Sequence, residues 1–255
     1  MKRKEILKPP CIVKNFPLSK KAELRLMKTV IITGASGNLG MAVTSIFLLK
    51  GYRVVATVHD QEDLKELPQN QNLQADVLDL TNEAETETFV QKIIDRHQTI
   101  DGALLLVGGF AAGNISETKS GDIKKQISLN FDTAYHVTRP LFQHMLAKNN
   151  GRIVFIGARP ALQAVDGKNL IAYGLSKSLL FKLAEYLNAE AKGKNVTVSV
   201  VAPSTIDTEP NRKSMPDADP GKWVKPEALA EVLEFMISDK GGVLRETVLK
   251  VYNNA

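Results

Sequence analysis

The segment TGASGNLG occupies residues 33–40, between the apolar run TVII at 29–32 and a helix-like stretch at 41–50. A strand, a glycine-rich turn and a helix in this order can hold phosphates: Gly34 allows the tight turn, Gly37 lets the backbone approach a pyrophosphate, and Gly40 lets helix and strand pack closely. The first N–H groups of the helix and its positive dipole end would face those phosphates. A strand–turn–helix without a ligand would have a similar sequence, so the downstream residues must decide between the two interpretations. The other predicted contacts of this loop are Ser36, Asn38 and Leu39.

Strand-like and helix-like segments alternate along the rest of the chain. The expected strands are 29–32, 54–58, 73–75, 103–107, 152–156, 196–201 and 247–252, and the expected helices include 83–97, 122–146, 171–191 and 226–237. Strands that alternate with helices of this length form a parallel sheet covered on both faces. We therefore predict an α/β fold, a Rossmann-type doubly wound parallel sheet of about seven strands with helices on both faces. Ligands of such sheets bind beyond the carboxyl ends of the strands.

The charge is divided unevenly along the chain. Residues 1–26 contain eight Lys or Arg and two Glu, a net charge of +6, which leaves −1 for residues 27–255 out of the total of +5. We expect 1–26 to be a basic, disordered extension, or the product of an upstream start codon with the working start at Met27. Residues 27–255 are expected to form a single dinucleotide-binding domain. A basic patch on the domain itself is not evident, which argues against a nucleic-acid partner.

Other classes of protein fit the composition poorly. No apolar run reaches the roughly 18 residues that a membrane helix needs, and the first residues lack the apolar core of a secretory signal. The only cysteine is Cys11, so a disulfide scaffold is excluded for the domain. The four histidines do not have metal-ligand spacing, and we expect no metal site. The expected location is the cytoplasm.

Tyr173 and Lys177 form the second chemical motif, at the start of the expected helix 171–191. Residues at i and i+4 share one face of a helix. A phenol has a pKa near 10, and a nearby ammonium group favours the phenolate and lowers that pKa. The pair can therefore donate or accept a proton where a hydride moves, and a positioned acid of this kind accelerates a reaction by about 10²–10⁴. Tyr-x-x-x-Lys is common on protein surfaces, but its place after the glycine loop makes it specific.

With these motifs in this order, the chain resembles the short-chain dehydrogenase/reductase family over residues 28–252. The resemblance implies NADH or NADPH as cofactor, a small-molecule substrate and Tyr173 as the proton donor. Lys177 would assist Tyr173 and hold the nicotinamide ribose, and Asn130 would maintain a water-linked proton path to Lys177. The family also implies a homodimer through the two long helices, 122–146 and 171–191. Its further cofactor contacts would be Asp76 and Val77 at the adenine, Val107, Gly108 and Gly109 after the fourth strand, and Pro203, Thr205 and Thr208 at the nicotinamide end.

The chain departs from the main branch of this family in its glycine loop, where the second glycine of the main branch lies one place later, and at two places after strands. An Asn-Asn-Ala-Gly motif is expected after the fourth strand, where residues 105–108 read LLVG, and a catalytic serine after the fifth, where Ala158 follows Gly157. Residues 107–113, 157–162 and 205–219 resemble the dihydropteridine reductases of the family instead. That resemblance implies hydride transfer to a quinonoid dihydropterin or a similar flat conjugated ring. Asn130, which those reductases lack, leaves open a broad carbonyl or quinone reductase, and a non-catalytic nicotinamide-binding sensor is the alternative of another class.

Two features of the site stay open at the level of sequence. The end of the second strand, Val58 followed by His59, lacks the acid that selects NADH in the pterin enzymes, yet no Lys or Arg stands there to hold a 2′-phosphate. The segment 204–222 contains no clear helical run and is either a lid over the site or a passive loop. Candidate substrate contacts are Phe110, Arg159, Met215 and Trp223, of which the aromatic residues fit a core role equally well and Arg159 an exposed one.

Overall fold

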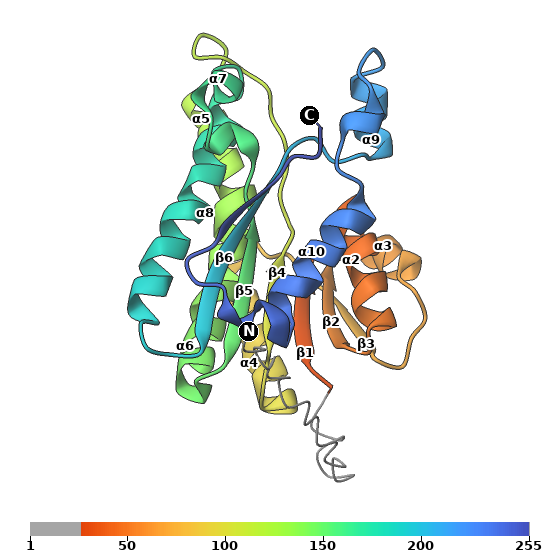
Figure 1. The fold of residues 1–255 in the computed structure, drawn as a ribbon, viewed down its shortest axis with the longest axis vertical. Coiled ribbons are helices and arrows are strands. Elements are labelled where there is room, and N and C mark those ends of the chain that lie inside the picture. Colours follow the sequence, from red (N-terminus) through yellow and green to blue (C-terminus); the bar gives the residue numbers. More distant parts are fainter. Residues whose placement is uncertain (1–26, 255) are drawn as a thin grey trace, which may run out of the picture.

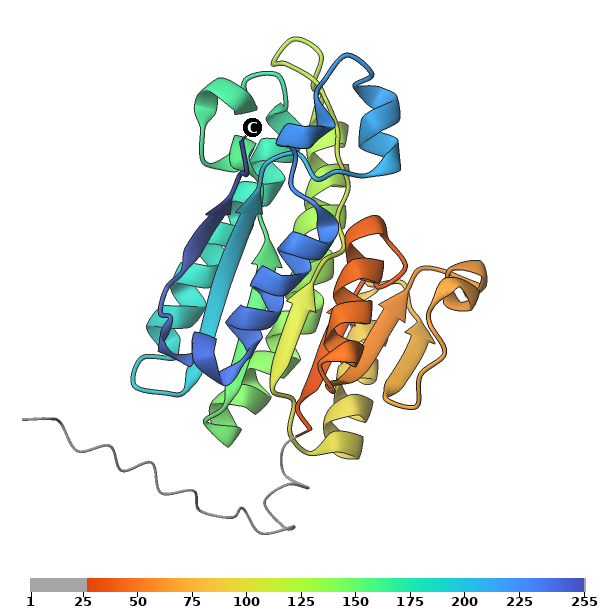
Figure 2. The same cartoon turned by 45° about the vertical axis from the view of Figure 1, so that its right-hand side comes forward.

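The computed structural model describes residues 27–254, so the predictions for residues 1–26 lie outside the described residues. Seven parallel strands form one sheet in the order β3-β2-β1-β4-β5-β6-β7 (Figures 1 and 2). The predicted Rossmann-type sheet is thereby confirmed. Its strand order reverses between β1 and β4, which creates the crevice where ligands of such sheets bind. The strands are β1 Thr29–Thr33, β2 Arg53–Val58, β3 Leu73–Val77, β4 Gly102–Leu105, β5 Gly151–Ile156, β6 Val196–Pro203 and β7 Val248–Val251.

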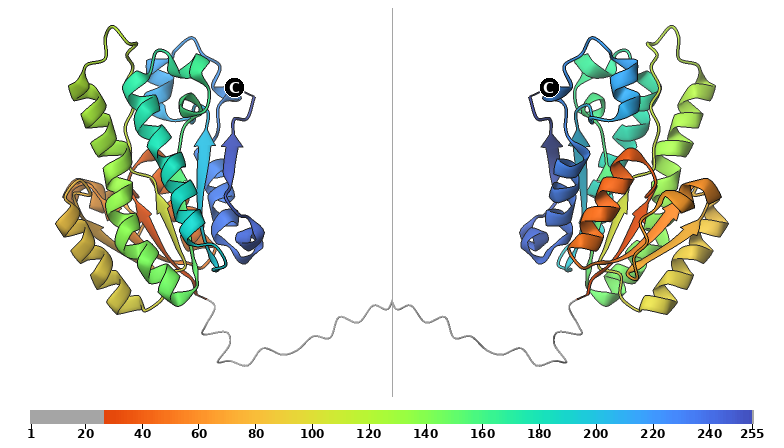
Figure 3. Two further views of the ribbon diagram at one scale, coloured as in Figure 1. Left: turned by 90° about the vertical axis from the view of Figure 1, so that its left-hand side faces the viewer. Right: turned by 90° about the vertical axis from the view of Figure 1, so that its right-hand side faces the viewer.

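Helices cover both faces of the sheet (Figure 3). One face carries α4 (Glu83–His97), α6 (Thr133–Lys148) and α8 (Ile171–Glu190), and the other carries α2 (Asn38–Leu49) and α10 (Pro226–Ile237). Side chains of one strand alternate between the two faces. In β1, for example, Ile31 packs in the core under the first set of helices, whereas Val30 and Ile32 pack in the core under the second. None of the helices in the described residues is long and apolar enough to cross a membrane.

The predicted helix 122–146 is interrupted in the structure. The chain forms α5 (Ser120–Ile127), then a π-helical turn over Ser128–Asp132, then α6. A π turn widens the helix by one residue and is common at functional sites. It reorients the helix at Asn130, which is fully buried.

The prediction of a segment without helices at 204–222 was wrong. The structure contains α9 at Glu209–Ser214 and a 3-10 turn at Pro220–Lys222, and α7 (Ala164–Gly167) and α9 lie beyond the carboxyl ends of the strands (Figure 1). Thr208 caps α9, because its hydroxyl accepts a hydrogen bond of 3.3 Å from Asn211 N. Pro210 stands in the first turn, where its missing N–H does no harm. Pro210 and Pro220 therefore stand at the beginning of helical turns rather than prevent them.

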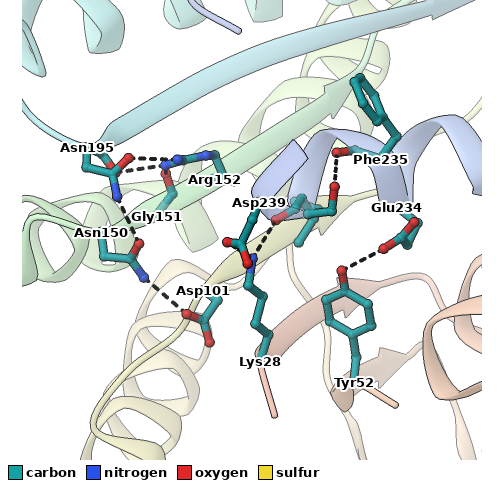
Figure 4. A network of polar contacts seen from close by, with 12 residues as sticks. Lys28, Tyr52, Asp101, Asn150, Gly151, Arg152, Asn195, Glu234, Phe235 and Asp239 are labelled. Carbon is teal, nitrogen blue, oxygen red and sulfur yellow. Dashed lines mark hydrogen bonds and ion pairs between the residues drawn. The ribbon is translucent and has the colours of Figure 1, made fainter. Parts of the chain in front are cut away.

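A polar network fixes the opposite end of the sheet, where the strands begin (Figure 4). Asp101 accepts hydrogen bonds from Thr29 N at 2.9 Å and from Asn150 Nδ2 at 3.1 Å, which joins β1 to the turn before β5. Arg152 binds the carbonyl and the side chain of Asn195, which joins β5 to the start of β6. Because this end is closed by structural contacts, the carboxyl ends of the strands are the open side of the sheet.

Candidate active site

The glycine loop has the conformation that a phosphate site requires. Gly34 has φ of +65°, a left-handed conformation that favours glycine. Gly40 lies against the loop so closely that a Cβ on it would stand 2.0 Å from Gly34 O. Helix α2 starts just after Gly37, without a side-chain cap and without an acidic residue in its first turn. Its first N–H groups therefore lack side-chain partners, as an anion-binding helix end requires.

A cavity of about 400 Å³ adjoins this loop at the point where the strand order reverses. Its lining includes seven of the residues predicted to bind a cofactor: Gly34, Ser36, Gly37, Val58, His59, Val107 and Gly108. Asn38, Leu39 and Gly40 form the first turn of α2 beside it. The close backbone turn, the uncapped helix end and the cavity together fit the pyrophosphate and adenosine portions of a dinucleotide.

Asp76 and Val77, expected at the adenine, do not line the cavity. The Asp76 carboxylate accepts a hydrogen bond of 2.9 Å from Gln74 and lies 3.5 Å from Lys92 Nζ. Strand β3 runs two residues further than predicted, and Val77 pairs with Val58 in the sheet. The wall therefore begins after the strand, and the residues that sequence analysis missed are Thr57, Asp63, Leu78, Asp79, Leu80, Thr81, Leu106, Leu129 and Thr133.

Tyr173 and Lys177 lie one turn apart near the start of α8. Lys177 is buried, and its Nζ donates a hydrogen bond of 2.9 Å to Ile156 O at the end of β5. Burial lowers the pKa of Lys177 to about 8. Burial also raises the pKa of the Tyr173 phenol to about 12, opposite to the lowering that the neighbouring ammonium predicts, because loss of hydration disfavours the phenolate. Tyr173 is therefore protonated at neutral pH and suited to donate a proton.

Asn130 connects the loop after β4 with helix α8. Its Oδ1 accepts a hydrogen bond of 2.9 Å from Gly109 N. The two N–H groups of its Nδ2 are shared among Gly109 O, Gln126 Oε1 and Ser176 Oγ, at 3.0, 2.9 and 3.1 Å. The Ser176 hydroxyl in turn donates to Tyr173 O at 2.8 Å. Sequence analysis missed Gln126 and Ser176. The available signal for Gln126 was its spacing, because a residue four positions before Asn130 lies on the same side of a helix.

Gly108 is the place where Asn130 and Lys177 meet. A Cβ on Gly108 would lie 2.5 Å from Asn130 Oδ1 and 3.0 Å from Lys177 Nζ. The structure therefore brings Asn130 and Lys177 together behind Gly108, which itself lines the cavity.

The four candidate substrate residues differ in exposure and in contacts. Phe110 is 67% exposed, and its ring stands 5.3 Å from that of Tyr173, edge to face. Arg159 forms an ion pair of 3.0 Å with Asp166 and lies over the ring of Tyr252, so it is not simply solvated. Trp223 is only 6% exposed, which favours its core role, whereas Met215 is 37% exposed at the end of α9.

The predicted nicotinamide-end residues lie at the carboxyl end of β6. Pro203 is the last residue of that strand. Thr205 O accepts a hydrogen bond of 2.9 Å from Val224 N, and the Thr208 hydroxyl is used in capping α9. Ala158, at the expected serine position, is buried. Residue 158 therefore supplies no hydroxyl group.

Comparison with known proteins gives a consistent picture. The sequence profile of the short chain dehydrogenase family matches residues 28–219. The chain is 25% identical to 3-oxoacyl-[acyl-carrier-protein] reductase FabG of Thermotoga maritima, over 88% of this chain and 96% of that protein. It is 28% identical to dihydropteridine reductase of Dictyostelium discoideum, over 82% and 87%. Among solved structures, ElxO with NADP bound superposes with a TM-score of 0.83 at 25% identity, over 89% of this chain and 97% of that one.

Proposed function

Because this chain belongs to the short-chain dehydrogenase family and is an NAD(P)H-dependent oxidoreductase, we propose that it reduces a quinonoid dihydropterin or a similar flat conjugated ring. The observation that carries this choice is the exposed ring of Phe110 beside Tyr173, in a chain that has Ala158 where the family has a serine. The site has an exposed aromatic ring 5.3 Å from the phenol, and it lacks a hydroxyl at residue 158. Flat rings stack on aromatic side chains, and the exposed ring of Phe110 supplies such a surface.

The cofactor, when bound, supplies the hydride, and the residues of the chain handle the proton. The Tyr173 hydroxyl, protonated at neutral pH, donates its proton to the substrate heteroatom that gains charge. Lys177 holds the nicotinamide ribose and helps to restore the proton of Tyr173. Asn130, fixed by Gly109 and Ser176, orients the water path to Lys177.

The absence of a serine has a physical explanation for this substrate class. Reduction of a ketone builds charge on one oxygen, and a second donor beside Tyr173 then stabilises the transition state. Reduction of a quinonoid ring spreads the charge over several heteroatoms, so one donor suffices. We therefore expect Ala158→Ser to change kcat/KM for a quinonoid pterin by less than about tenfold. A larger gain, measured with the same cofactor, would contradict the proposal.

The proposed function is tested by following oxidation of NADH and of NADPH in parallel, with quinonoid dihydropterin generated in the cuvette. Turnover with the pterin and none with a 3-oxoacyl thioester supports the proposal. The reverse result supports a second candidate, a broad carbonyl reductase. Two observations favour that alternative: Asn130 is intact, and the reductase of Thermotoga maritima is similar over nearly its whole length.

The pH dependence of activity and of stability should show whether the Lys177 ammonium group is needed for turnover. We expect kcat/KM for the cofactor to fall as pH rises through about 8, because the Lys177 ammonium is lost there. The contribution of Lys177 to the free energy of unfolding changes in the other direction. Its pKa is lowered from 10.5, so the unfolded chain binds more protons between about 8 and 10.5 and stability rises with pH in that window. A decline in activity without a matching decline in Tm, measured from pH 7 to 9.5, therefore assigns the effect to Lys177, and a flat activity profile would refute the assignment.

A homodimer through α6 and α8 completes the proposal. Helix α8 exposes Leu175, Leu179 and Tyr186, and α6 exposes Tyr135. Apolar residues gathered on long helices mark an interface more often than a solvated face. Light scattering of the full chain at micromolar concentration should give the mass of two chains, and the mass of one chain would contradict the interface.

A further inference from the structure

We propose that Asp63 and Asp79 face the adenosine ribose of the cofactor and make the protein select NADH over NADPH. The inference rests on the cofactor site of the proposed function and not on the choice of substrate. Both residues lie outside the glycine loop and the end of β2, the two sequence features from which contacts with this half of the cofactor were predicted. Both aspartates line the cavity next to the phosphate loop.

The orientation of the cofactor follows from the positions of the two ends of the site. Tyr173 and Lys177 lie on the β5 side of the phosphate loop, with Gly108 at the end of the neighbouring β4 segment. The chemistry therefore occurs on that side. The opposite part of the cavity, formed by Thr57, Val58, His59 and the residues after β3, must receive the adenosine half.

Asp63 is fixed in the first turn of α3 (Gln61–Glu66). Asp60 caps this helix, and its carboxylate accepts a hydrogen bond of 2.9 Å from Asp63 N. The capping leaves the Asp60 side chain engaged, while Asp63 lines the cavity and is half-buried. A carboxylate in this position can accept hydrogen bonds from the ribose hydroxyls.

Asp79 is held in the loop after β3. Its Oδ1 accepts hydrogen bonds from Thr81 N at 2.9 Å and from Thr81 Oγ1 at 2.7 Å. These two bonds, with a smaller effect of His59, lower the pKa of Asp79, so this carboxylate is ionised at neutral pH. His59 is the one basic side chain that lines the cavity in the described residues.

The charge balance opposes a 2′-phosphate. Within residues 27–254, the lining contains two carboxylates and neither Lys nor Arg. A phosphate monoester carries about −1.5 to −2 charges at pH 7. Asp63 is half-buried and Asp79 is exposed, and like charges a few ångströms apart repel, more strongly at the half-buried group, whereas NADH presents only a neutral hydroxyl there. The full chain should therefore bind NADH at least about tenfold more tightly than NADPH.

Binding rather than turnover is the measurement that tests this inference. We would titrate the full chain with NADH and with NADPH by nicotinamide fluorescence, at low and high salt. In the double variant Asp63→Asn, Asp79→Asn, the ratio of Kd values (NADPH over NADH) should fall at least about fivefold, mainly through tighter NADPH binding. High salt should reduce the ratio of the unaltered chain in the same direction. Asn keeps an oxygen that can accept from Thr81, and Tm of the variant checks that the loop is intact.

Glu62→Gln is the matched control. Glu62 stands beside Asp63 on α3, but its side chain is 81% exposed and pairs with Lys65. Its neutralisation should change the Kd ratio by less than about twofold. Equal or tighter binding of NADPH by the unaltered chain would overturn the inference, as would a ratio that Asp63→Asn, Asp79→Asn leaves unchanged. Because no substrate is present, failure of the pterin assay does not affect this result.

Discussion

Replacement of Tyr173 with Phe should lower kcat by a factor of about 10²–10⁴ and leave the Kd for the cofactor unchanged. Phe keeps the ring, and with it the contact to Phe110 at 5.3 Å, and removes only the hydroxyl that donates the proton. The main chain of Tyr173 still accepts the hydrogen bond from Ser176, so the helix should not shift. Single-turnover oxidation of NADH or NADPH would report the loss directly.

The control for this variant is Tyr186→Phe. Tyr186 lies thirteen positions further along the same helix and is 67% exposed, and Phe keeps its ring on the proposed dimer face, so this variant should retain full activity. If Tyr173→Phe kept more than about a tenth of the activity, the proton would have to come from another group. The same pair of variants separates an enzyme from a nicotinamide-binding sensor, since a sensor would bind the cofactor equally well in both and turn over substrate in neither.

The order of the elements could be predicted because strands and helices leave two different apolar patterns in the sequence. Apolar runs bounded by glycine, such as 152–156, correspond to β5, and the apolar stripe at 83–97 coincides with α4. Both predictions depend on local patterns, because burial of one side of an element fixes which of its positions are apolar. The glycine loop could be predicted for a related reason, since Gly40 and Gly34 are required by contacts within eight residues of one another.

Features that depend on contacts far apart in the chain were not predictable in this way. The π turn at 128–132 places Asn130 against Gly109 and Ser176, and nothing in the local pattern distinguishes it from an α turn. Strand β3 extends to Val77 because it pairs with Val58, although residues 76–77 do not have an apolar pattern. The residues that line the cavity beside this strand are therefore those around Asp79 and not Asp76.

The pKa of Tyr173 shows the same limit in energetic terms. The spacing predicted Tyr173 and Lys177 one turn apart on a helix, and the structure has them so. The sign of the pKa shift depends on how deeply the phenol is buried, which is a property of the whole fold. In the folded protein burial decides, so Tyr173 keeps its proton at neutral pH, and its phenolate would be a stronger base than the isolated motif implies.

Replacement of Gly40 with Ala should have the second large effect, on both the fold and the cofactor site. The added Cβ would stand 2.0 Å from Gly34 O and 2.8 Å from Ala35 Cα, which are backbone atoms and cannot rotate away. Either α2 moves off β1 or the phosphate loop is displaced. Overpacking of this kind destabilises by about 1–3 kcal/mol, and the same strain placed in the loop would weaken cofactor binding by about 5- to 150-fold.

Gly37→Ala distinguishes the two roles of the glycines. A Cβ on Gly37 has only Gly34 O nearby, at 3.4 Å, an ordinary contact, and its φ of −64° suits any residue. This variant should keep the Tm of the unaltered chain and lose cofactor affinity, because the added methyl group stands where the pyrophosphate approaches the backbone. Gly40→Ala should lower Tm by several degrees even without cofactor. Equal Tm values for Gly40→Ala and the unaltered chain would show that the helix does not pack on the loop as closely as described, whereas unaltered affinity in Gly37→Ala would remove the pyrophosphate from this turn.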